Sequence, residues 1–90
     1  MVNKIHYKIG DILYHESNIQ PHYLEGDGKL ENQIWWTKAD TKYLNNLYIY
    51  LIVDIIEKEF ITKYYLSFFH NGKHYAAFAT NLKWVIKMEQ

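Results

Sequence analysis

The second half of the chain, from Tyr48 to Met88, contains dense runs of residues that are typical of β-strands. Tyr, Phe, Ile, Val and Leu dominate these runs, and such side chains favour a pleated, half-buried backbone. A polar dipeptide, Asn71-Gly72, divides the runs, and both of its residues readily adopt the positive φ angles of a two-residue hairpin turn. The sequence therefore predicts an all-β fold built around a hairpin.

Six segments are expected to form strands, because β-prone residues alternate there or lie between turn signals. They are residues 11–16, Gln33–Thr37, Tyr48–Glu57, Phe60–His70, His74–Thr80 and Lys83–Glu89. Residues 17–46 are polar and contain Pro21, so we expect a long insertion after the first strand, in which Gln33–Thr37 is a short strand. One or two helical turns within residues 37–47 are the alternative for that part of the insertion, and a 3₁₀ turn is expected at Thr80–Leu82.

The turn at Asn71-Gly72 sets the register of the hairpin, because a two-residue loop places His70 opposite Lys73 and Phe69 opposite His74. Successive side chains of a strand point to opposite faces. The face expected to point inward consists of Tyr64, Leu66, Phe68, Tyr75, Ala77 and Ala79. The face expected to point to solvent or to a covering loop consists of Lys63, Tyr65, Ser67, Phe69, His74, Ala76 and Phe78.

Alternation also assigns faces to two other strands. In the strand Tyr48–Glu57, Leu51, Val53 and Ile55 share one face. The opposite face, which the charge of Asp54 is expected to turn outward, consists of Tyr50, Ile52, Asp54 and Ile56. In the strand Lys83–Glu89 we expect Trp84 and Ile86 to be buried.

Several of these segments, in this order, resemble SH3-like small β-barrel proteins. The segments that carry the resemblance are Lys8–Tyr14, Tyr50–Ile55, Tyr64–Leu66, Asn71-Gly72 and Leu82–Ile86. The resemblance implies a strongly bent antiparallel barrel of five or six strands. In length and in its use of Lys, Asn, Ile and Tyr, the chain is also similar to short accessory proteins of phages and mobile elements in low-GC bacteria, which implies a host enzyme or defence complex as the partner.

Composition limits the classes of function. Ninety residues predict one domain, residues 1–90, and the absence of Cys excludes disulfides and thiolate chemistry. Ten Lys balance ten acidic residues and there is no Arg, which disfavours nucleic-acid binding because phosphate contacts need a basic patch. No apolar run is long enough to span a membrane or to serve as a signal peptide, so a cytoplasmic protein is expected.

The titratable residues do not form a recognisable catalytic or metal site. His70 and His74 have the spacing of a helical ligand pair, but the hairpin register places them on opposite faces of the sheet. Glu57 and Glu59 share one face if the strand continues through both, but a catalytic carboxylate pair needs a shaped cleft and split pKa values, and we expect a solvated edge here. We therefore expect no catalytic residue, no metal ligand and no cofactor.

Aromatic side chains, 18% of the residues, provide the main functional hypothesis, because Trp and Tyr are enriched at the centres of protein interfaces. We expect a non-catalytic module that binds a larger protein, with the partner-binding residues Trp35, Trp36, Tyr65, Phe69, His74 and Phe78. Folding of the insertion over these rings is the competing structural interpretation. Two other functions are considered: single-stranded nucleic-acid binding, and dimerisation through an edge strand such as His74–Thr80.

Overall fold

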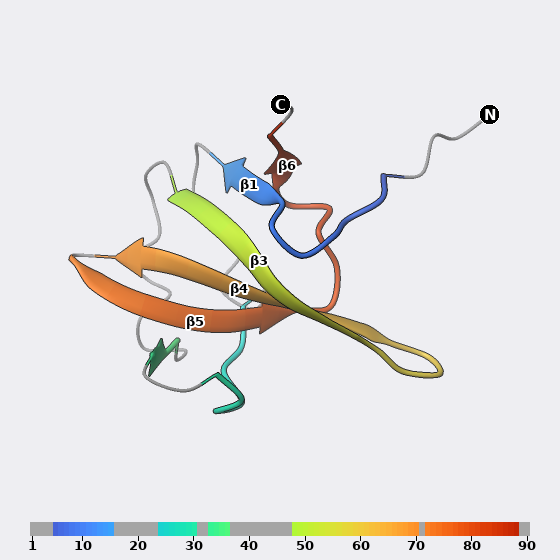
Figure 1. The fold of residues 1–90 in the computed structure, drawn as a ribbon, viewed down its shortest axis with the longest axis horizontal. Coiled ribbons are helices and arrows are strands. Elements are labelled where there is room, and N and C mark those ends of the chain that lie inside the picture. Colours follow the sequence, from blue (N-terminus) through green and yellow to red (C-terminus); the bar gives the residue numbers. More distant parts are fainter. Residues whose placement is uncertain (1–4, 16–23, 31–32, 37–47, 71, 89–90) are drawn as a thin grey trace.

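The computed structural model describes residues 5–15, 24–30, 33–36, 48–70 and 72–88, and these form one six-stranded sheet (Figure 1). Its strands are β1 (Ile12–His15), β2 (Ile34–Trp35), β3 (Tyr48–Glu57), β4 (Thr62–His70), β5 (Lys73–Ala79) and β6 (Ile86–Lys87). The order across the sheet is β2-β5-β4-β3-β1-β6. The described residues contain no helix, so the predicted all-β class is confirmed for this part of the chain; residues 37–47, where helical turns are the alternative, lie outside it.

The sheet is mixed, and its described strands do not close into a barrel. β2 pairs with β5 in parallel, whereas the β5-β4, β4-β3, β3-β1 and β1-β6 pairs are antiparallel. The prediction that all strands pair in an antiparallel manner is therefore wrong for β2. β5 lies between β2 and β4, and the edge strands of the sheet are β2 and β6. The strand suggested for edge-to-edge dimerisation, His74–Thr80, is therefore not an edge strand.

The β4-β5 hairpin has the predicted register. His70 lies opposite Lys73, Phe69 opposite His74 and Phe68 opposite Tyr75. Gly72 adopts a φ of 75°, a left-handed conformation that glycine reaches without a steric penalty. The inward face is also confirmed: a core of buried side chains contains Leu66, Phe68, Tyr75, Ala77 and Ala79, and Tyr64 packs against it.

A β-bulge in β3 reverses the predicted faces of its first half. The register with β4 shifts between Ile52 and Asp54, so one extra residue is inserted into the strand. Tyr50 and Ile52 are fully buried, whereas Leu51 is 41% exposed, the opposite of the expectation. After the bulge, Ile55 packs against the core. Strict alternation fails here because the bulge changes which face each later residue occupies.

The C-terminal segment turns where a continuous strand is expected. Residues 83–84 form a turn, and the strand β6 begins only at Ile86. The Asn81 side chain accepts a hydrogen bond from the Lys83 N–H (3.2 Å), and the Trp84 indole donates to the Asn81 carbonyl (2.9 Å). Burial follows the turn: Val85 is buried and Ile86 is 57% exposed, so the expectation that Ile86 is buried is wrong. The 3₁₀ turn expected at residues 80–82 is replaced by a bend at residue 80.

Aromatic rings fill the centre of the core. Trp36, only 1% exposed, meets Phe68 and Tyr75 edge to face, with ring centroids 5.2 Å apart in both pairs. Tyr50 contacts Phe68 in the same way at 5.0 Å. Such pairs stabilise a fold by about 0.5–1.5 kcal/mol each beyond the area that they bury. The short strand β2 is therefore held by the ring of the residue that follows it.

We expect Trp36→Ala to lower the free energy of unfolding by about 3–5 kcal/mol, because the substitution empties a large, enclosed site. Phe69→Ala removes an exposed ring and should cost less than about 1 kcal/mol. Urea denaturation followed by circular dichroism measures both values. Equal losses in the two variants would contradict the burial described above.

Candidate partner-binding surface

The six residues expected to bind a partner occupy three different environments. Trp36 lies in the core on the inner face of the sheet. Tyr65 and Phe78 lie on the opposite, outer face but are buried, and Trp35 and His74 are half-buried there. Phe69 is 68% exposed and is the predicted residue most accessible to a partner. The set is thus not one continuous surface.

Residues 24–30 cover part of the outer face. Glu25 and Phe78 exchange backbone hydrogen bonds of 2.9 Å and 2.6 Å, and the Trp36 N–H donates to the Ala76 carbonyl at 2.9 Å. Leu24, next to this bridge, is buried in the core. We call residues 24–30 the covering segment. It explains why Tyr65 and Phe78 are buried. Their face is expected to point to solvent or to a covering loop, and at these two residues it points to a covering loop.

Ion pairs and rings fix the covering segment. The Tyr65 hydroxyl donates to the Asp27 carboxylate at 2.6 Å, and the Lys29 ammonium lies 5.1 Å from the centroid of the Tyr65 ring. Lys29 also pairs with Asp54 (3.3 Å), and Lys63 with Asp27 (3.8 Å). Burial, the hydrogen bond to Asp27 and the nearby carboxylates raise the pKa of Tyr65 to about 12. The hydroxyl therefore stays protonated and keeps donating at physiological pH.

Gly26 allows the covering segment to approach β2 closely. A Cβ atom at this position would lie 2.7 Å from the carbonyl oxygen of Trp36 and 3.1 Å from the Cβ of Trp35. Both distances are shorter than a normal van der Waals contact, and the first involves backbone, which cannot rotate away. Only glycine fits here without moving the chain.

A polar cluster lies beside the exposed Phe69 ring. Ser67 and His74 are in hydrogen-bond contact through the hydroxyl and Nε2, and the Gln33 amide nitrogen lies 3.1 Å from the same Nε2 and 3.4 Å from the hydroxyl. Phe69 stacks on the His74 ring with centroids 4.8 Å apart. The cluster joins Gln33, the residue before β2, to β4 and β5 on the outer face, and the Phe69 ring stacks on its histidine.

An exposed apolar region, which sequence reasoning missed, extends from Phe69 across four strands. Tyr14 of β1 lies opposite Ile49 of β3 and Ile86 of β6. Ile12 lies opposite Leu51, which in turn lies opposite Ser67, two positions before Phe69. We call this region the outer strip; it consists of Ile12, Tyr14, Ile49, Leu51, Phe69 and Ile86.

Four members of the outer strip are strongly exposed for apolar residues on strands. The exposed fraction is 52% for Ile49, 41% for Leu51, 57% for Ile86 and 68% for Phe69. Unbroken alternation predicts that Leu51 and Ile86 are interior residues, but the bulge in β3 and the turn before β6 break the alternation. The sequence does contain a signal for this surface. Ile49 and Leu51 lie two residues apart and so share one face of the strand, and Tyr48 and Tyr50 share the other.

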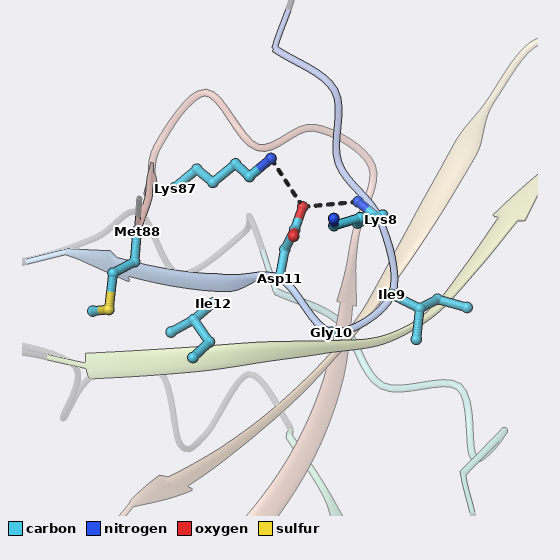
Figure 2. Close-up of a pocket in the computed structure, with 7 residues that line it drawn as sticks. All are labelled: Lys8, Ile9, Gly10, Asp11, Ile12, Lys87 and Met88. Carbon is cyan, nitrogen blue, oxygen red and sulfur yellow. Dashed lines mark hydrogen bonds and ion pairs between the residues drawn. The ribbon is translucent and has the colours of Figure 1, made fainter. Parts of the chain in front are cut away.

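A pocket of about 280 Å³ lies between β6 and the chain that leads into β1 (Figure 2). The Asp11 carboxylate, 7% exposed, accepts a hydrogen bond there from the Lys8 backbone N–H (2.9 Å) and pairs with the Lys87 ammonium (3.2 Å). Burial alone would raise the pKa of Asp11, but these two partners outweigh it and lower the pKa below its usual value. Because donors of the same chain satisfy the carboxylate, we interpret this site as a structural tie between β1 and β6.

In the described part of the chain, no group of three or more His, Cys, Asp and Glu side chains is arranged to hold a metal ion. Within the same residues, no helix has the length and apolar character needed to cross a membrane. No family model, curated protein or solved structure matches the chain. The outer strip is the candidate functional surface because it exposes Ile49, Leu51, Phe69 and Ile86 on paired strands.

The ionised Asp11 should make stability depend on pH. Its pKa is lowered by folding, so its contribution is complete above the unfolded value of about 3.9 and is lost as the pH falls through the lower folded value. At pH 7 we expect Asp11→Asn to lower the free energy of unfolding by about 1–3 kcal/mol. The difference from the unsubstituted protein should shrink below about pH 4.

Denaturant titrations over this pH range test the expectation, with Glu57→Gln as the control because Glu57 is exposed. A pH-independent difference between Asp11→Asn and the unsubstituted protein would contradict it.

Gly26→Ala should detach the covering segment, because the added Cβ collides with the Trp36 carbonyl. We expect a loss of about 1–3 kcal/mol in unfolding free energy. The amide of Phe78, which donates to Glu25, should exchange its hydrogen faster. Glu25→Ala, a change at an exposed neighbouring side chain, is the control; unchanged exchange in Gly26→Ala would refute the role of this glycine.

Proposed function

We propose that the protein is a non-catalytic interaction module that binds a larger protein through the outer strip. The exposure of Phe69 carries this proposal. A strand side chain of this size normally packs against something, and contiguous exposed apolar patches often mark interaction sites. Phe69 is also oriented by His74, so little conformational entropy is lost when a partner covers it.

The position of the strip supports protein binding. Its four strongly exposed side chains extend from β3, β4 and β6, which are joined through β1 in one hydrogen-bonded sheet. Aliphatic and aromatic anchors on a rigid support typically form the energetic centre of an interface. Trp36, Tyr65 and Phe78 contribute indirectly in this proposal, because they build the support and hold the covering segment.

Nucleic-acid binding receives less support from the same surface. An exposed ring such as Phe69 can stack on a base, but such sites also need free cations along a groove. Lys29, Lys63 and Lys87 are each paired with a carboxylate of this chain. The outer strip itself contains no charged side chain.

The similarity in style to accessory proteins of phages and mobile elements suggests the class of partner. We propose a host enzyme or defence complex in the bacterial cytoplasm, which the module inhibits or modulates. An apolar strip suits such a target, because it binds by burying surface and needs no reactive group of its own.

Capture from bacterial lysate tests this function. The tagged protein should retain a defined larger protein, and Phe69→Ala should reduce the affinity by about 30-fold or more, as expected for an anchor residue. Phe60→Ala is a matched control, because Phe60 is 91% exposed but lies on the turn between β3 and β4, away from the strip. Equal capture by Phe69→Ala and the unsubstituted protein would overturn the assignment of the surface.

A further inference from the structure

We infer that His74 and Gln33 form a proton-operated switch beneath the exposed Phe69 ring: when His74 takes up a proton, the Gln33 side-chain amide turns over and a positive charge appears beside the outer strip. The switch itself is a property of the free chain. The inference rests on the proposed function only for its consequence, which is that the acid form of the protein binds a partner at the outer strip less tightly.

The hydrogen-bond geometry of the polar cluster corresponds to the neutral form of His74. The amide nitrogen of Gln33 lies 3.1 Å from the His74 Nε2 atom. An amide nitrogen can only donate, so Nε2 has to accept, and the ring proton of neutral His74 has to sit on Nδ1. The Ser67 hydroxyl, which also contacts Nε2, can donate or accept and therefore fits either form of the ring.

The other end of the same amide shows what the neutral form leaves unpaired. The Gln33 side-chain oxygen is buried and has no hydrogen-bond partner among the residues that the structure describes. A buried oxygen without a donor destabilises the arrangement that contains it. The nitrogen and oxygen of a carboxamide have nearly the same size, so rotation about the last side-chain bond exchanges them without moving the backbone. The cluster therefore has a second arrangement of similar shape.

Protonation of His74 selects this second arrangement. Both ring nitrogens of a protonated histidine carry hydrogen, so Nε2–H and the Gln33 NH₂ group would face each other as two donors. After the amide rotates, the Gln33 oxygen accepts a charge-assisted hydrogen bond from Nε2–H, which is stronger than a bond between neutral groups. Histidine is the side chain that ordinarily gains its charge between about pH 8 and about pH 5, which defines the range for an experiment.

The surroundings of His74 leave the new charge without a counter-ion. The described side chains that contact it are Gln33, Ser67 and Phe69, which are all uncharged. Lys73, the preceding residue of β5, belongs to the opposite face by alternation. On the outer face, the carboxylates of Asp27 and Asp54 are engaged with Tyr65, Lys63 and Lys29. Because no carboxylate of the described residues contacts His74, proton uptake adds a net charge to this part of the surface.

The new charge lies under the residue on which the proposed binding surface depends. Phe69 stacks on the His74 ring, with the ring planes 18° apart and the centroids 4.8 Å apart. A partner that covers Phe69 also removes water from the half-buried His74 ring, and removing water from a cation is unfavourable. The attraction between the cation and Phe69 exists before and after binding, so it offsets little of this effect. We expect the affinity for a partner to fall about tenfold in the acid form.

NMR titration of the free, full chain between about pH 8 and about pH 5 tests the switch. At the alkaline end, the imidazole spectrum of His74 should show hydrogen on Nδ1 and none on Nε2. As His74 takes up its proton, the Gln33 side-chain NH₂ signals should shift with the same midpoint. The NH₂ signals of Asn81, a residue outside the polar cluster, are the internal control and should not follow this midpoint.

Two NMR results would overturn the inference. Hydrogen on Nε2 at the alkaline end would mean that the Gln33 oxygen already faces the ring. Gln33 signals that do not change with the titration of His74 would mean that the amide does not turn over.

Two histidine variants connect the switch to binding. His74→Gln keeps a polar side chain that cannot gain a charge, and His6→Gln removes an exposed histidine outside the polar cluster. The probe is the purified protein that lysate capture retains. Relative to His74→Gln, the unsubstituted protein should bind it about tenfold more weakly at about pH 5.5 than at about pH 7.5, and His6→Gln should behave like the unsubstituted protein. Circular dichroism at both pH values verifies that the variants remain folded.

This comparison separates the inference from the proposed function. Titration of the partner affects all three forms alike, so it cancels in the ratio of affinities. The same ratio at both pH values would overturn the inference, whereas Phe69-dependent capture would leave the proposed function standing. If no protein is captured, the proposed function fails, and the NMR titration of the free chain decides the switch by itself.

Discussion

The antiparallel pairing of β4 with β5 is the constraint on which the remaining structure depends. Its register sends Phe68 and Tyr75 to one face of the sheet and Tyr65 and Phe78 to the other. A two-stranded ribbon with large rings on both faces exposes too much apolar surface to be stable alone. The chain covers the inner face with Trp36, β3 and β1, and part of the outer face with the covering segment. The uncovered remainder contains Phe69.

The outer face thus combines a closed half and an open half. In the closed half, Tyr65 is tied to Asp27, and both lysines of that region pair with carboxylates. In the open half, apolar side chains of β3, β4 and β6 lie exposed, and Phe69 of β4 stacks on His74 of the polar cluster. This contrast explains why the aromatic residues of the chain divide into structural and exposed groups. It also concentrates the functional proposal on Phe69 and its apolar neighbours.

The bulge in β3 shows how one backbone irregularity changes a functional interpretation. Alternation places Leu51 inside and Ile52 outside, whereas the structure has the reverse. A β-bulge inserts one residue, and this extra residue reconciles a buried Ile52 with an outward Asp54. Because of the bulge, Leu51 and Asp54 both face outward, opposite Ser67 and Tyr65, although they lie three residues apart. The turn before β6 has a similar effect, because it exposes Ile86 and buries Val85.

The sequence by itself determined the all-β class, the extent of β3 and the hairpin with its register, because Asn71-Gly72 and the β-prone runs act locally. It also placed Phe69 on the outward face of this hairpin. Only the tertiary structure decided that β2 pairs in parallel with β5, that Trp36 is core and Trp35 is not, and that the outer strip is continuous. Those features depend on contacts between residues far apart in the chain, such as Ala76 with Trp36 and Tyr14 with Ile49. No local pattern encodes such contacts, because they result from competition among all segments for the same apolar surface.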